Sequence, residues 1–148
     1  MKGTGETPTK RRLLPLFFGL LVLATVLRVH AQVVVIANPT VAVTGVSKTE
    51  LRDIFTGAST SLQNSMQVTP VLLKQGAVQD AFLGLYIGKS DSAFRAGWRS
   101  ILFSGQGAMP KTLDSEAAVV EYVARTPGAI GYIGRSAPHE GVKVLAVR

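Results

Sequence analysis

The residues best suited to chemistry form a short run, Lys74-Gln75-Gly76-Ala77-Val78. This run follows a predicted strand and precedes a predicted helix. The first amides of a helix have no partner within it, and the helix dipole favours negative charge beside them. Lys74 adds positive charge, and open α/β sheets bind ligands at the carboxyl ends of their strands. We therefore interpret residues 74–78 as a candidate anion site; the alternative is an empty junction, which most α/β domains contain.

Patterns for catalysis or metal binding are sparse. After residue 31 the one histidine is His139 in a polar turn, and neither G-x-S-x-G nor H-E-x-x-H occurs. These are too few groups for a catalytic triad or a two-histidine metal site. Gly105-Gln106-Gly107 follows a predicted helix, so we expect a loop there and no dinucleotide-binding turn. The absence of cysteine excludes thiol chemistry, zinc–thiolate sites and a lipid-bearing cysteine. We expect no enzymatic activity, no cofactor and no metal.

Two aromatic residues deserve separate expectations. Trp98 falls on the apolar stripe of a predicted helix, which indicates packing in the core. Tyr132 comes at the end of a predicted strand, where it could be buried or half exposed as a binding residue.

The elements that would position the candidate site alternate between strands and helices. Strands are predicted at residues 33–37, 68–73, 129–133 and 142–147, with Pro70 indicating a sheet edge or an early break. One helix begins at the capping box Ser47…Glu50 and ends at Gly57. Three further helices are predicted from apolar residues at helical spacing. The first has Val78, Ala81, Phe82 and Leu85. The second begins at Ser90 or Asp91 and has Phe94, Trp98, Ile101 and Leu102, and the third begins at Asp114 or Ser115 and has Val119, Val120 and Val123. Residues 58–67 are expected to be a polar loop. This order predicts an α/β fold, a single three-layer lobe with a mostly parallel sheet flanked by helices.

The first 31 residues have the composition of an export signal. Lys10-Arg11-Arg12 precedes the apolar run from Leu13 to Leu27, and small residues stand at 29 and 31. The apolar run is shorter than the roughly 20 residues that span a bilayer, although an uncleaved anchor is the alternative. We predict a signal peptide at 1–31 and a periplasmic or secreted domain at 32–148. Because five of the 16 basic and one of the nine acidic residues lie in that segment, removing it lowers the net charge from +7 to +3. Nucleic-acid binding is therefore not expected.

Two segments carry a resemblance to a known family: Leu51-Arg52-Asp53-Ile54-Phe55-Thr56-Gly57 has the pattern L-x-x-I-F-x-G, and Thr126-Pro127-Gly128-Ala129-Ile130-Gly131-Tyr132 has the pattern T-P-G-A-I-G-Y. With these motifs the chain resembles the phosphate-type substrate-binding proteins of ABC transporters, in which the first pattern is a helix and the second a strand entry. The resemblance covers about residues 33–147 and implies one lobe, the second, of a type 2 periplasmic-binding fold. It also implies that Lys74 stands where the family has an arginine, and that Ala77, Val78 and Gln79 replace the family's phosphate-binding hydroxyl residues.

The resemblance leaves two functions open. The first is a lobe of a phosphate uptake or sensing system that binds phosphate or another small oxyanion weakly and contacts a transporter or sensor protein. The second is a ligand-free interaction module, which uses its former cleft face for a protein partner or for self-association as a homodimer. After signal cleavage no stable membrane anchor is expected.

Overall fold

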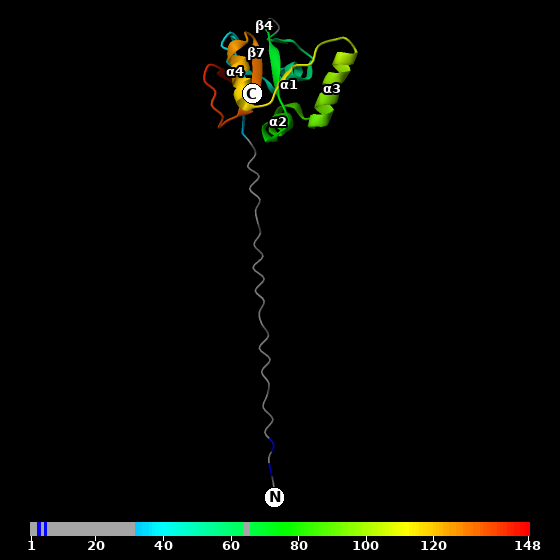
Figure 1. Ribbon diagram of the computed structural model, residues 1–148, viewed down its shortest axis with the longest axis vertical. Coiled ribbons are helices and arrows are strands. Elements are labelled where there is room, and N and C mark those ends of the chain that lie inside the picture. The colour runs from blue at the N-terminus through cyan, green and yellow to red at the C-terminus, as the bar shows by residue number, and fades with distance from the viewer. Residues whose placement is uncertain (1–2, 4, 6–31, 64–65) are drawn as a thin grey trace.

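The computed structural model describes residues 3, 5, 32–63 and 66–148 (Figure 1). Apart from residues 3 and 5, the predicted export signal at 1–31, with its cleavage site, lies outside the described residues. Within the described ranges, no helix has both the length and the apolar character needed to cross a membrane.

A six-stranded sheet forms the centre of the molecule, in the order β2-β8-β1-β7-β5-β6. Its strands are β1 (Val33–Ala37), β2 (Gly45–Val46), β5 (Thr69–Leu73), β6 (Lys111–Leu113), β7 (Ala129–Gly134) and β8 (Lys143–Val147). Three of the five strand pairs are parallel: β2–β8, β5–β6 and β5–β7. The prediction of a mostly parallel sheet is confirmed, and β1 alone among these strands runs antiparallel to both of its neighbours.

The helices are α1 (Lys48–Thr56), α2 (Ala77–Phe82), the π-helical segment η1 (Leu83–Ile87), α3 (Asp91–Phe103) and α4 (Glu116–Arg125). The predicted capping box is present, because the Ser47 hydroxyl accepts from the Glu50 amide at 3.1 Å and the Glu50 carboxylate accepts from the Ser47 amide at 2.9 Å. Gly57 ends α1 in the left-handed conformation with φ 80°. Of the two residues proposed for each later cap, the structure selects Ser90 for α3 and Ser115 for α4.

Helices cover both faces of the sheet and make three layers. In Figure 1, α4 lies on one side of β7, and α1, α2 and α3 lie on the other. Consecutive residues of β7 point alternately toward these two helical layers. A Cβ built at Gly131 would lie 3.0 Å from Val119 of α4, whereas the Tyr132 ring packs against Phe55 of α1. The predicted three-layer arrangement is therefore confirmed.

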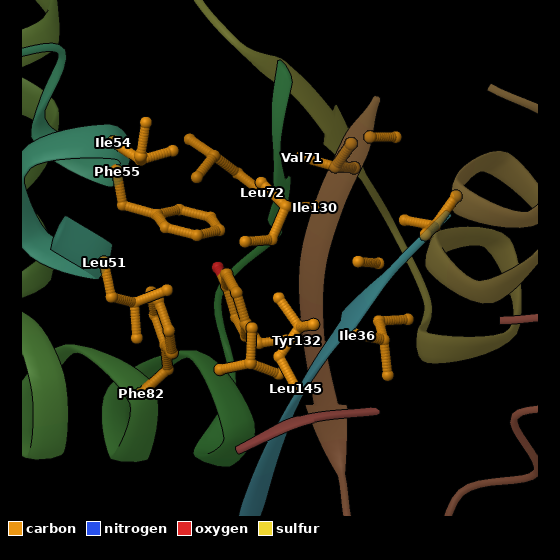
Figure 2. Close-up of a cluster of buried hydrophobic side chains, with 14 of the residues drawn as sticks. Ile36, Leu51, Ile54, Phe55, Val71, Leu72, Phe82, Ile130, Tyr132 and Leu145 are labelled. Atoms are coloured by element: carbon orange, nitrogen blue, oxygen red, sulfur yellow. The ribbon is translucent and has the colours of Figure 1, made fainter. Parts of the chain in front are cut away.

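The core lies mainly between the sheet and α1, α2 and η1 (Figure 2). Leu51, Ile54 and Phe55 of α1 project toward side chains from β5 and β7. Trp98 is buried as predicted, and its indole nitrogen donates to the backbone carbonyl of Phe55 at 2.9 Å.

Two apolar residues expected on inward faces are exposed. Leu85 is 51% exposed because the helix widens to the π geometry in η1, where the Gly88 amide donates to the Leu83 carbonyl. This shift brings Leu83 and Ile87 inward and turns Leu85 outward. Leu102 is 46% exposed at the end of α3, where Ile101, three residues after Trp98, is the half-buried residue.

The sequence patterns also missed several short elements. The predicted polar loop at 58–67 contains two paired strands, β3 (Ser61–Leu62) and β4 (Met66–Gln67), with Leu62 buried.

The edge position suggested by Pro70 is wrong, because β5 lies between β7 and β6. Proline has no backbone amide to donate. Pro70 is nevertheless tolerated, because it is paired with Ile130 of β7 and the pairing of β5 with β6 begins only at Val71, so no donor toward β6 is needed at residue 70.

Candidate functional site

The predicted anion segment lies beside a second strand-to-helix junction. β5 ends at Leu73 and α2 begins at Ala77; β6 ends at Leu113 and α4 begins at Glu116. Because β5 and β6 are parallel neighbours, both junctions lie at the same end of the sheet, where these strands terminate. Between them is a hollow of about 300 Å³, lined by Leu73, Lys74, Gln75, Gly76, Ala77, Val78, Asp114, Ser115 and Glu116. The structure thus brings all five predicted residues together.

The backbone at this hollow is suited to an anion. Gly76 precedes α2 with φ 153°, a conformation that strongly favours glycine. Serine hydroxyls cap α1, α3 and α4, whereas among the described residues no side chain caps α2. The first amides of α2, starting at Ala77, are therefore available to a ligand oxygen.

The charges around the hollow have both signs. The Lys74 ammonium lies 3.1 Å from a carboxylate oxygen of Asp114, and their side chains are 66% and 83% exposed. Glu116 lines the same hollow and its carboxylate accepts from the Gly134 amide. Asp80 adds a further acidic group in the first turn of α2. The hollow therefore combines amide donors and one lysine with carboxylates that oppose an anion.

Asp114, Ser115 and Glu116 were not among the predicted site residues. They are about forty positions away from Lys74 in the chain, and only the pairing of β6 with β5 brings them beside it. β6 has three residues, Lys111–Leu113, which is too few for a period-2 pattern to be recognised.

Tyr132 belongs to the core beneath the hollow at residues 74–78. Its ring stacks on that of Phe82 (Figure 2), and the two ring centroids are 3.8 Å apart. Its hydroxyl accepts from the Leu73 amide at 3.0 Å and donates to the side-chain oxygen of Gln79. Burial raises the pKa of Tyr132 above its ordinary value. Of the two possibilities left open by the sequence, the buried one is correct.

A polar network continues from Tyr132 to the start of α3. Gln79 is fully buried, and its amide nitrogen donates to Asp91 at 3.1 Å. Arg95 donates to the other carboxylate oxygen of Asp91 at 2.9 Å. Burial alone would raise the pKa of Asp91, but the hydrogen bonds from Arg95 and Gln79 outweigh it and the pKa is lowered. The network fixes α2 against β5, β7 and α3, and so fixes the helix whose amides line the hollow.

A second hollow of about 300 Å³ lies at the other end of β5 and β6. It is lined by the starts of both strands, by Gly57 and by a mainly apolar group that includes Trp98, Ile101, Met109 and Pro110. Gly105-Gln106-Gly107 follows α3 as a non-helical connection, as predicted, and its last two residues line this hollow. His139 lies in the connection between β7 and β8, with one ring nitrogen 2.8 Å from the Ala137 carbonyl.

The layered sheet, with a hollow where its parallel strands end, has the fold of a periplasmic-binding-protein lobe. Solved structures similar to it include phosphate-binding proteins. A phosphate ABC transporter substrate-binding protein from Clostridium perfringens, with bound phosphate, matches with a TM-score of 0.61 and 19% identity over 78% of this chain and 44% of that chain. PstS from Borrelia burgdorferi matches at 0.58 and 19% identity, covering 79% and 47%. An ABC-type phosphate transport receptor from Vibrio cholerae matches at 0.52 and 14% identity, covering 78% and 46%.

These matches confirm the resemblance at the level of fold. The chain spans less than half the length of each of these proteins. No protein-family model matches the sequence, and no curated protein matches it significantly.

Proposed function

We propose that this chain is an exported phosphate-binding-type lobe that binds phosphate or a similar small oxyanion weakly in the hollow at residues 74–78. The observation that carries the proposal is the position of this hollow. In a fold shared with phosphate-binding proteins, it lies where two parallel strands end and the uncapped α2 begins. The ligand oxygens would accept from the amides of Gly76, Ala77 and Val78, and Lys74 would supply the charge.

Three features of the hollow predict weak binding. It is open to water, so each charged contact is screened. Lys74 presents a single ammonium instead of the bidentate fork that an arginine offers. Carboxylates of Asp114 and Glu116 line the same space. We expect a dissociation constant on the order of 0.1–10 mM.

The cellular role follows from the same proposal. Residues 1–31 direct export, residues 32–148 form the lobe, and the lobe serves a phosphate-type uptake or sensing system by contacting its transporter or sensor protein. The lobe binds its ligand without converting it. N-terminal sequencing of the periplasmic fraction tests the export step, with Gln32 as the expected first residue. An intact Met1 or Lys2 terminus there would contradict cleavage.

Amide chemical shifts during a phosphate titration test the binding step, using protein recovered from the periplasmic fraction at low ionic strength. We expect shifts concentrated at residues 74–80. Lys74→Ala should weaken them, whereas Lys89→Ala, which removes an exposed lysine beyond the far end of η1, should leave them in place. Shifts scattered over the surface would contradict phosphate binding at this hollow.

A further inference from the structure

The candidate hollow already contains a carboxylate that contacts its lysine. Lys74 lies in the loop between β5 and α2, and Asp114 lies between β6 and α4. Their charged atoms are 3.1 Å apart, and both residues line the hollow. Among the nine lining residues, all of them in the described part of the chain, Lys74 is the one basic residue. A ligand that needs the charge of Lys74 must therefore compete with Asp114.

The two lining carboxylates differ in how firmly they are held. Glu116 is tied to β7, because its carboxylate accepts from the Gly134 amide. Asp114 is 83% exposed, and exposed ion pairs contribute little to stability. Asp114 can therefore move out of the hollow at low cost, whereas moving Glu116 would break a hydrogen bond to the backbone.

From this arrangement we infer that Asp114 is an internal competitor of the oxyanion and a determinant of its affinity. The inference rests on the proposed function. In the empty hollow the carboxylate of Asp114 neutralises Lys74, which the phosphate would otherwise contact. When phosphate enters, Asp114 swings toward solvent and Lys74 turns to the ligand. The affinity is lowered by the lost ion pair and by the repulsion between phosphate and the nearby carboxylate.

The variant Asp114→Asn tests this role, because it removes the charge and keeps the shape of the side chain. Phosphate titrations followed by amide shifts at low ionic strength should give a dissociation constant about three- to tenfold lower than that of the wild type. Glu121→Gln is the matched control. It also raises the net charge by one and breaks an exposed ion pair, with Arg125 at 3.0 Å, but it lies within α4 and away from the hollow. The control should change the phosphate affinity by less than about twofold.

A second pair of variants separates release of Lys74 from a general change in charge. In a Lys74→Ala background, Asp114→Asn should tighten phosphate binding less than it does in the wild type, because the two side chains interact. An equal gain in both backgrounds would overturn the competition with Lys74.

The outcomes distinguish this inference from the proposed function. If wild-type shifts concentrate at residues 74–80 but Asp114→Asn binds phosphate no more tightly than Glu121→Gln, the role of Asp114 is wrong and the phosphate site stands. If neither the wild type nor Asp114→Asn shows localised shifts, the proposed function itself is wrong, and the role of Asp114 with it.

Discussion

Two hollows of about 300 Å³ lie at opposite ends of the neighbouring strands β5 and β6. Where the strands end, the hollow is lined by Lys74, Asp114 and Glu116 together with the backbone of two helix starts. Where the strands begin, the lining is mainly apolar and contains the buried ring of Trp98.

The difference follows from the direction of the strands. Parallel strands that lead into helices bring uncapped amides and polar loop residues to one edge, and this edge is suited to charged ligands. At the opposite end, β5 follows the β3–β4 pair and β6 follows the connection after α3, and the indole of Trp98 in α3 donates to the Phe55 carbonyl in α1. The two ends should therefore respond differently to substitution: the apolar end through stability, and the charged end through ligand affinity.

Trp98→Ala should have the largest effect and should act on stability alone. Removing a buried indole that also donates to the Phe55 carbonyl is expected to lower the free energy of unfolding by about 3–5 kcal/mol. Urea denaturation measures this loss. Phe103→Ala is the matched control, because Phe103 lies on the same helix and is 85% exposed. A loss no larger than that of Phe103→Ala would contradict the stabilising role of the Trp98 ring at the apolar end.

Tyr132→Phe should have the next largest effect. The substitution leaves the ring stacked on Phe82 but removes the hydroxyl between the Leu73 amide and Gln79. Leaving these buried groups unpaired is expected to cost about 1–3 kcal/mol in urea denaturation. Tyr122→Phe, at a half-buried position of α4, is the control. Equal stability of the two variants would mean that the Tyr132 hydroxyl does not hold the base of the charged hollow.

Lys74→Ala should separate the two ends most clearly. Because the side chain is 66% exposed, its removal is expected to leave the unfolding curve unchanged. Phosphate affinity should fall by about three- to tenfold, since the hollow loses its lysine. Titrations with phosphate and with added salt measure this loss. An unchanged affinity would remove the functional distinction between the two hollows.

Asp91→Asn should produce the smallest effect, a modest loss of stability at neutral pH that disappears in acid. Hydrogen bonds from Arg95 and Gln79 lower the pKa of Asp91 in spite of its burial. A carboxyl group whose pKa is lower in the folded state than in the unfolded state stabilises the fold when the pH is above its unfolded-state pKa of about 4. This contribution is lost as the pH falls through the lower pKa of the folded state. Urea denaturation at pH 7 and below pH 4 should therefore show a smaller acid loss in Asp91→Asn than in the wild type. Identical slopes would show that Asp91 does not link α2 to α3 in this way.

Much of the fold could be predicted from local patterns. The capping box at Ser47 and Glu50, the apolar run of β1 and the burial of Trp98 each depend on neighbours in the chain, and each was predicted correctly. The errors occurred where the pattern was short or changed its period. β6 has three residues, and the π geometry of η1 turns Leu85 outward in a segment that reads as an ordinary helix.

The candidate site divides in the same way. The sequence by itself placed the run Lys74–Val78 at a strand-to-helix junction, because a strand followed by a glycine and a helix is a local signal. Only the tertiary structure decided that Asp114 and Glu116 share the hollow, that Tyr132 lies buried beneath it, and that an apolar hollow lies at the other end of the same strands. These relations depend on which strands pair and on the faces that their residues present. Pairing between distant segments is decided by packing of the whole core, for which one sequence carries no local signal.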